Sequence, residues 1–238
     1  MHLLRFRHFP EYTAEQFFAQ KETKPFQRSY LTRIIKKFID PKHTVAEIGS
    51  HSVFTLLEAS GAKIQAIIDP YTGGKGGGIS HIPNLPYPTV LFRCEIGLDS
   101  EIIPDAFFNA TFSCSVIEHV GQAEANYDCM PTENPPQEQE TIRDRFCREL
   151  YRITKPGGLT FHTVDHAARN LTFQRNFEAE GFVLKPVDEE PISLVGEALF
   201  AEDVVRQRHD WVKVDQPFSD DEQRLHGVLF MCFEKPRT

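Results

Sequence analysis

The sequence of 238 residues has no long apolar run, no Cys-x-x-Cys pair and no run of basic residues. Its five cysteines are odd in number, which excludes a fully paired disulfide framework, and their spacing is not that of a zinc site. We therefore expect no bound metal and a reduced, cytoplasmic protein. No stretch approaches about 18 consecutive apolar residues, and Arg5 follows Leu4 directly, so we expect neither a signal peptide nor a membrane span.

Acidic residues are in excess, with a formal net charge of −8 and a sequence pI near 5.7. Proteins that bind nucleic acid phosphates need a basic surface, so the composition favours a small-molecule partner over nucleic acid. The first 43 residues are locally basic, which indicates either a solvated helix face or a lid that attracts an acidic substrate. The basic residues are Arg5, Arg7, Lys21, Lys24, Arg28, Arg33, Lys36, Lys37 and Lys42, against Glu11, Glu15, Glu22 and Asp40.

The length suits one α/β domain with additions. A strand, a helix and a second strand within residues 44–68 imply a right-handed parallel crossover. Helices are predicted over Tyr12–Asp40 (in two parts, broken near Pro25), Ser52–Ser60, Gln139–Ile153 and Ala167–Glu180. Strands are predicted over Thr44–Ile48, Ala62–Ile68, Thr89–Arg93, Ala110–Val116, Leu159–Val164, Trp211–Val214 and Val228–Phe233. The segment Lys155-Pro156-Gly157-Gly158 is expected to separate helix from strand, and the last two strands to form an antiparallel pair at a sheet edge.

Glu47-Ile48-Gly49 lies where the first strand should end. A glycine there lets the backbone turn tightly and lets a ligand approach the start of the next helix. No GxGxxG can be written, because His51 and Val53 occupy the neighbouring positions. Asp69 ends the second strand about twenty residues beyond the turn, where a carboxylate can accept hydrogen bonds from ribose hydroxyls. The alternative is an ordinary surface aspartate before a proline.

Two later stretches distinguish among nucleotide-binding folds. They are FFNATFSCSVIEHV, residues 107–120, and FCRELYRITKPGGLTFHTVDH, residues 146–166. Together with the first strand and its turn, and in this order along the chain, they resemble the class I S-adenosylmethionine-dependent methyltransferases rather than dehydrogenases. The resemblance covers about residues 40–165. The resemblance implies a Rossmann-like α/β fold, with a mostly parallel seven-stranded sheet, helices on both faces and an antiparallel final strand. We expect residues 1–40 to form an N-terminal helical lid segment and residues 41–238 the methyltransferase domain, within one structural domain.

The resemblance also implies S-adenosyl-L-methionine as the cofactor and assigns roles to strand ends. Glu47 would face the amino-acid part of the cofactor, Gly49 would make the turn, and Asp69 would hold the ribose. The backbone of Ser115 and Val116 would lie beside the methionine portion. The predicted cofactor-binding residues are Glu47, Gly49, Ser50, His51, Asp69, Glu95, Ser115 and Val116.

Other positions match the family pattern less closely. Glu95 is the expected residue near the adenine, with Asp99 as a competing candidate. His51 and Val53 replace small residues in the turn, and His51 could either block the methionine end or point away from it. Asn109 stands where many relatives have aspartate before the fourth strand. These departures bear on cofactor affinity rather than on the fold.

Histidines are the candidate catalytic residues. A hydroxyl acceptor loses its proton on methylation, and a neutral histidine near the carboxyl ends of the strands is the natural base. His119 and His166 are the two candidates, although His119 can instead cap the helix after the fourth strand. His162 is predicted to be a hydrogen-bonded packing residue, and His81 and His51 are outside candidates.

The leading functional hypothesis is a methyltransferase that acts on a small molecule, with oxygen slightly favoured over nitrogen as the acceptor atom. One alternative is a degenerate methyltransferase-fold protein that binds a ligand without catalysis, which cofactor binding would test. Another is a protein or RNA methyltransferase, for which the basic front segment is the only support. A third alternative is a nicotinamide dehydrogenase, which only Gly49 and Asp69 support. The oligomeric state is left open.

Overall fold

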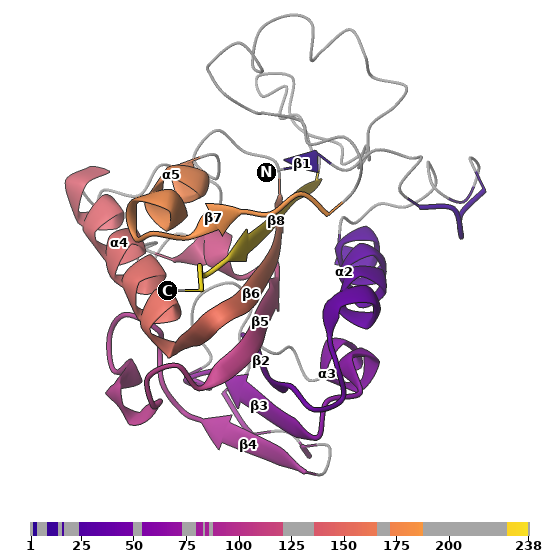
Figure 1. The fold of residues 1–238 in the computed structure, drawn as a ribbon, viewed down its shortest axis with the longest axis horizontal. Helices are drawn as coiled ribbons and strands as arrows, with labels where there is room; N and C mark the ends of the chain where they lie inside the picture. The colour runs from indigo at the N-terminus through magenta and orange to yellow at the C-terminus, as the bar shows by residue number, and fades with distance from the viewer. Residues whose placement is uncertain are drawn as a thin grey trace, which may run out of the picture.

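The computed structural model describes residues 2–3, 9–13, 16, 24–49, 54–72, 80–82, 84–85, 88–120, 136–165, 172–187 and 228–237. These residues form one eight-stranded sheet flanked by helices, as Figure 1 shows. The strand order is β1-β8-β6-β5-β2-β3-β4, with β7 also paired to β8. Among the described helices none is long and apolar enough to cross a membrane.

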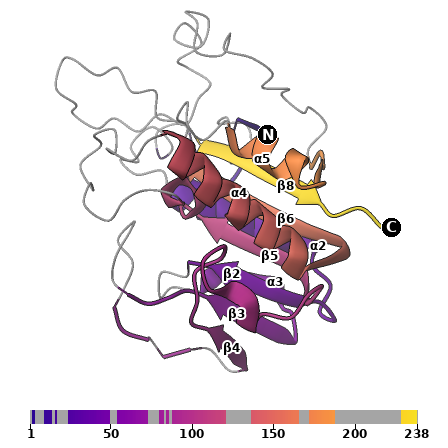
Figure 2. The same ribbon diagram turned by 90° about the vertical axis from the view of Figure 1, so that its left-hand side faces the viewer.

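Five neighbouring strands are parallel, and Figure 2 shows them in order from β4 at the bottom to β6, which lies beside β8 at the top. They are β2 (Thr44–Ile48), β3 (Ile64–Ile68), β4 (Thr89–Phe92), β5 (Phe108–Cys114) and β6 (Thr154–Asp165). β8 (Val228–Glu234) runs antiparallel to β6, to β1 (His2–Leu3) and to β7 (Val183–Leu184). The predicted fold class is confirmed, with a mostly parallel sheet that ends in an antiparallel strand.

Helices cover both faces of the sheet. α2 (Lys24–Phe38) and α3 (Thr55–Ser60) lie on one face, and α4 (Pro136–Ile153) and α5 (Thr172–Ala179) lie on the other (Figure 1). Each face has its own apolar core, because successive side chains of a strand point to opposite sides. On β8, Phe230 and Cys232 belong to the core under α2, whereas Met231 belongs to the core under α4 and α5.

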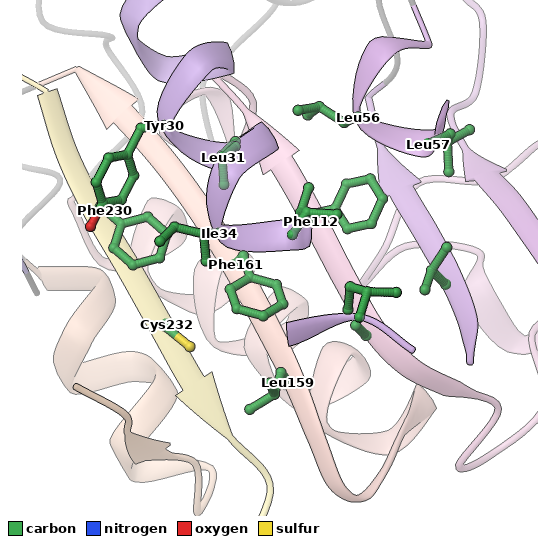
Figure 3. Close-up of a cluster of buried hydrophobic side chains, with 14 of the residues drawn as sticks. Tyr30, Leu31, Ile34, Leu56, Leu57, Phe112, Leu159, Phe161, Phe230 and Cys232 are labelled. Atoms are coloured by element: carbon green, nitrogen blue, oxygen red, sulfur yellow. The ribbon is translucent and has the colours of Figure 1, made fainter. Parts of the chain in front are cut away.

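α2 is anchored by large buried side chains. Figure 3 shows Tyr30, Leu31 and Ile34 pointing from the helix toward the sheet. The ring of Tyr30 meets the ring of Phe230 edge-on, with 4.9 Å between the centroids. Residues three and four apart lie on one side of a helix, so this spacing predicts the buried face correctly. α2 therefore belongs to the same core as the sheet.

The Lys155-Pro156-Gly157-Gly158 segment differs from the prediction. α4 ends at Ile153, and β6 begins at Thr154 instead of five residues later, so the two glycines lie inside the strand. The amide of Gly157 donates to the carbonyl of Lys235 at 2.7 Å, and the amide of Lys235 donates to the carbonyl of Gly158 at 2.9 Å. The register between β5 and β6 shifts here, which is a β-bulge, and Gly157 has a φ of +76° that suits a glycine.

The last strands also differ in part from the prediction. β8 lies within the sheet, because β1 and β7 pair with the side of it that faces away from β6. The predicted antiparallel orientation of Val228–Phe233 is confirmed, and the edge on this side of the sheet belongs to the two-residue strands β1 and β7. The proposed partner Trp211–Val214 lies outside the described residues, as does most of the first predicted helix after Tyr12.

The strand order reverses between β2 and β5. From β2 the chain proceeds outward through β3 to β4, then returns to β5 on the other side of β2 and continues to β6. In open α/β sheets, ligands bind at the carboxyl ends of the strands beside this switch point, because the connections diverge there. The carboxyl ends of β2, β3 and β5 are therefore the region in which to look for a site.

Candidate functional site

Three strand ends, those of β2, β3 and β5, carry most of the predicted cofactor-binding residues and lie at one edge of the sheet. Pairing of Ile48 with Ile68 brings Gly49 beside the end of β3, where its amide donates to the carbonyl of Ile68 at 2.9 Å. The amide of Asp69 donates to the carbonyl of Phe92 at 3.1 Å, which extends the pairing of β3 with β4. On the other side of β2, the amide of Ser115 donates to Thr163 at 3.0 Å. The ladder hydrogen bonds thus hold these strand ends in place.

Left-handed backbone conformations cluster at these strand ends. Gly49 has a φ of +66°, and a Cβ atom there would lie 2.7 Å from both γ-carbons of Val116. The close approach of β2 to the β5 end therefore requires glycine. Tyr71, two residues beyond Asp69, has a φ of +51°, and Ser115 has a φ of +53°. Such conformations cost roughly 1–3 kcal/mol each for non-glycine residues and are concentrated at functional sites.

Glu47 is a buried acid at the end of β2, with 7% of its surface exposed. Burial raises its pKa to about 7, while the charge of Arg28 and a hydrogen bond from the Leu57 amide act in the opposite direction. Within the described part of the chain, its Oε2 atom has no hydrogen-bond partner. A carboxylate in this state is suited to a cationic ligand group, which would favour its charged form.

Asp69 is also largely buried, with 9% of its surface exposed. Its Oδ1 accepts the Tyr71 amide at 2.7 Å, which closes a turn directly after β3. Burial raises the pKa of Asp69, and the Tyr71 amide lowers it. The alternative of an ordinary surface aspartate is therefore wrong. An aspartate that accepts one amide still has lone pairs for ribose hydroxyls.

Tyr71 is a site residue that the sequence did not single out. Its side chain is 2% exposed, and burial together with the charges of Asp69 and Glu47 raises its pKa to about 12. The phenol oxygen of Tyr71 and the hydroxyl oxygen of Ser115 are both buried without a partner among the residues that the structure describes. With Oε2 of Glu47, they form a set of three orphaned polar atoms from three neighbouring strand ends. Buried polar atoms are normally hydrogen-bonded, so this set is suited to a polar ligand.

Glu95 and Asp99 lie in one turn after β4. The Glu95 amide donates to Oδ1 of Asp99 at 2.6 Å, and the Glu95 carbonyl accepts the amides of Leu98 and Asp99. The carboxylate of Asp99 thus stabilises the turn, and Glu95 is half-buried. Asn109, the departure from the family pattern, also has a local role. Its Oδ1 accepts the Thr44 amide at 2.9 Å and the Lys155 ammonium at 3.0 Å.

The histidines separate into different environments. His119 is half-buried in the 3₁₀ turn η4 (Ile117–His119), directly after the β5 end. His162 is fully buried, and its ring nitrogens meet the hydroxyls of Ser113 at 2.7 Å and Thr160 at 2.5 Å. Burial lowers its pKa to about 3, so it stays neutral, and its prediction as a packing residue is confirmed.

Three predicted site residues cannot be placed. Ser50, His51 and His166 lie outside the described residues. His81, an outside candidate, is exposed. Among the positions that the structure describes, no group of three or more His, Cys, Asp or Glu side chains is arranged to hold a metal ion.

Comparison with known proteins supports the fold. No protein-family model and no curated protein matches the sequence. A solved complex of the Haloferax volcanii Trm112 methyltransferase activator with a methyltransferase contains a chain of 12% identity and TM-score 0.53, and the match covers 90% of this chain and 92% of that one. The [4+2]-cyclase SpnF matches with 14% identity and TM-score 0.50, over 87% of this chain and 81% of that one. An S-adenosylmethionine-dependent methyltransferase of Listeria monocytogenes has 13% identity and TM-score 0.49, and the match covers 87% of this chain and 98% of that one.

These likenesses show the fold alone, because the identities are low. The chain has the class I methyltransferase fold, as the sequence pattern predicts. One of the similar structures carries the name of a cyclase, so the fold by itself does not establish methyl transfer.

Proposed function

We propose that the protein is an S-adenosylmethionine-dependent methyltransferase that acts on a small-molecule acceptor, with oxygen slightly favoured over nitrogen. The observation that supports it most is the set of buried polar atoms without a described partner at the switch point, formed by Glu47, Tyr71 and Ser115. A soluble cofactor with an ammonium group, a sulfonium and ribose hydroxyls offers partners for such a set.

Each strand end would bind a different part of the cofactor. Glu47 would take the ammonium group, and Asp69 would accept hydrogen bonds from the ribose. The glycine at position 49 keeps side-chain atoms away from the β2 end, and the Ser115–Val116 backbone would lie beside the methionine portion. Glu95 would lie near the adenine. Ser50 and His51 are the remaining proposed cofactor-binding residues.

When bound, the cofactor supplies an electrophilic methyl group. The task of the chain is to hold an acceptor in line with that methyl group and to keep water away. Orientation of two reactants accounts for up to about 7–11 kcal/mol of the barrier in favourable cases, so few catalytic side chains are needed. For a hydroxyl acceptor, His119 or His166 would remove the proton. The N-terminal segment, residues 1–40, would cover the site, with α2 held in the core.

Cofactor binding tests the proposal. We expect calorimetric titration to give micromolar binding of S-adenosylmethionine and S-adenosylhomocysteine, and Asp69→Ala to weaken both by about tenfold to hundredfold, the effect of losing hydrogen bonds to a charged group. Glu178→Ala is the matched control, because Glu178 is an exposed acid on α5, on the opposite face. No binding at millimolar ligand, or equal effects of the two substitutions, would contradict the proposal.

A binding protein without methyl transfer is the second candidate. It is favoured by the altered turn after β2, where His51 and Val53 replace the small residues of the family pattern. Incubation with isotopically labelled S-adenosylmethionine and a panel of phenols, amines and carboxylic acids distinguishes the two. Binding without label transfer to any acceptor would favour the second candidate. Transfer to a protein or RNA fraction would favour a macromolecular acceptor instead.

A further inference from the structure

α2 carries several basic residues and no acidic one. Most of these basic side chains either contact a described residue or are exposed to solvent. Arg33 pairs with Glu11 at 3.3 Å, and the ammonium of Lys37 donates to the carbonyl of Val187 at 3.3 Å. Lys36 is exposed to solvent. Arg28 differs, since it is half-buried and forms no ion pair or hydrogen bond with any described residue.

The turn of α2 that holds Arg28 faces the candidate site. Gln27, the preceding residue, is fully buried, and its side-chain oxygen accepts the Cys114 thiol at 3.7 Å. Cys114 is the last residue of β5. On the other side of Arg28, Tyr30 is anchored in the core against the sheet (Figure 3). These contacts hold this turn at the carboxyl end of β5, next to β2.

The charge of Arg28 acts on two residues of the site. It lowers the pKa of Glu47 against the larger effect of burial, and it acts in the same direction on the Cys114 thiol. No ion pair joins Arg28 to Glu47, so the two charged groups are farther apart than direct contact. A guanidinium and a buried carboxylate therefore lie at one site, each without an opposite charge bound to it among the described residues.

We propose that Arg28 and Glu47 together bind a zwitterionic α-amino-acid group, with its carboxylate on Arg28 and its ammonium on Glu47. The inference rests on the proposed function, in which this group is the amino-acid end of the cofactor. A guanidinium binds a carboxylate through two parallel hydrogen bonds, which a lysine cannot reproduce. α2 is then part of the binding site as well as part of the core.

Two ligands that differ only in the amino-acid end test the proposal. S-adenosylhomocysteine has this end, and 5′-deoxy-5′-methylthioadenosine lacks it. We expect the wild-type protein to bind the first more tightly in calorimetric titrations. Arg28→Gln should lower the affinity for S-adenosylhomocysteine about tenfold to hundredfold, because hydrogen bonds between charged groups are lost. It should leave the affinity for 5′-deoxy-5′-methylthioadenosine unchanged. Arg28→Lys should give an intermediate loss, and Arg33→Gln on the same helix should change neither affinity.

Four results would overturn the inference. Unchanged S-adenosylhomocysteine affinity in a folded Arg28→Gln protein would show that Arg28 does not hold the carboxylate. Equal wild-type affinity for the two ligands would remove the amino-acid subsite while leaving the proposed function intact. Equal weakening of both ligands by Arg28→Gln and Arg28→Lys would indicate a general effect on the fold. If neither ligand binds the wild-type protein, the proposed function fails together with the inference.

Discussion

At the scale of single residues, Glu47 joins the candidate function to the stability of the fold. Its pKa of about 7 lies above the ordinary value of 4.5, because burial disfavours the carboxylate. The folded state therefore binds more protons than the unfolded state between these two values. The contribution to stability is fully present below about pH 4.5 and is lost as the pH rises through 7. A cationic ligand would compensate for this loss by pairing with the carboxylate.

The first prediction concerns the pH dependence of ligand binding. An ammonium group on Glu47 lowers the pKa of the carboxyl group, so binding releases a proton when the pH is below 7. We expect the affinity for S-adenosylhomocysteine to rise with pH, by at most about tenfold per unit, and to level off above about pH 7. Calorimetric titrations in buffers from about pH 5.5 to about pH 8.5 measure this dependence.

Glu47→Gln is the control for this prediction. The amide keeps the shape and removes the titration, so the variant should bind more weakly and with a flatter pH profile. Its free energy of unfolding should exceed that of the wild-type protein by about 1–3 kcal/mol near pH 8, because no charge is buried, and by little near pH 4.5. Identical pH profiles of binding for the two proteins would show that Glu47 does not meet the ligand cation.

At the scale of elements, the turn after β2 decides whether a ligand can approach. A Cβ atom at Gly49 would lie 2.7 Å from Val116, and at Gly61, which ends α3, it would meet no atom within 4 Å. The two glycines have similar φ values, +66° and +60°. Alanine at either position therefore suffers the same backbone strain, and only the first also suffers a clash.

The second prediction uses this matched pair. Gly61→Ala should lower the free energy of unfolding by about 1–2 kcal/mol, which is the cost of left-handed backbone for a residue with a Cβ atom. Gly49→Ala should cost about 1–3 kcal/mol more, the range for overpacking, and should abolish cofactor binding. Val116→Ala in the Gly49→Ala background should restore part of the stability. Denaturant unfolding and calorimetric titration measure both effects, and equal costs at the two glycines would refute the predicted clash.

The elements with strong local periodicity could be predicted from the sequence. The buried strand at residues 44–48 and the apolar face of α2 follow from alternation and helical spacing. The strand that includes Gly157 and Gly158 could not, because its pairing with Lys235 joins residues nearly eighty positions apart. For the same reason β1 could not be predicted, since two residues carry no period of their own.

The candidate site could be predicted as far as the chain order allows. Acids and a glycine at successive strand ends must meet at one edge of a parallel sheet, and the structure places Glu47, Gly49 and Asp69 there. The sequence did not indicate that Arg28 and Tyr71 lie at this site, because neither residue ends a predicted strand. The place of Arg28 depends on how a helix outside the strand-turn-helix pattern packs, and the inward turn of Tyr71 depends on a left-handed backbone conformation.

At the scale of the whole molecule, a buried polar network joins the centre of the sheet to α5. His162 bonds to Ser113 on β5 and to Thr160 on its own strand, and the Thr160 hydroxyl also accepts from Thr111 at 2.9 Å. The ring of His162 stacks on Phe177 of α5, with 5.4 Å between the centroids. Burial lowers the pKa of His162 and so favours the neutral imidazole in this network. Protonation of His162 should therefore loosen the sheet and α5 together.

The third prediction follows from this network. The pKa of His162 falls from 6.5 to about 3 in the folded protein, so between these values the unfolded state binds more protons. Stability should fall as the pH drops from about 6.5 toward 3, by at most about 1.4 kcal/mol per unit from this residue. Thermal unfolding near pH 7 and pH 4.5 should show a smaller acid-induced decrease in Tm for His162→Gln than for the wild-type protein or His43→Gln. An unchanged decrease in His162→Gln would contradict the prediction.

The position of a bound cofactor tests the central claim most directly. A crystal structure of the protein with S-adenosylhomocysteine should show the ligand at the carboxyl ends of β2, β3 and β5. Its ammonium group should contact Glu47, its ribose should contact Asp69, and its carboxylate should contact Arg28. A ligand bound elsewhere, or at this edge of the sheet without contact to Glu47 and Asp69, would contradict the account.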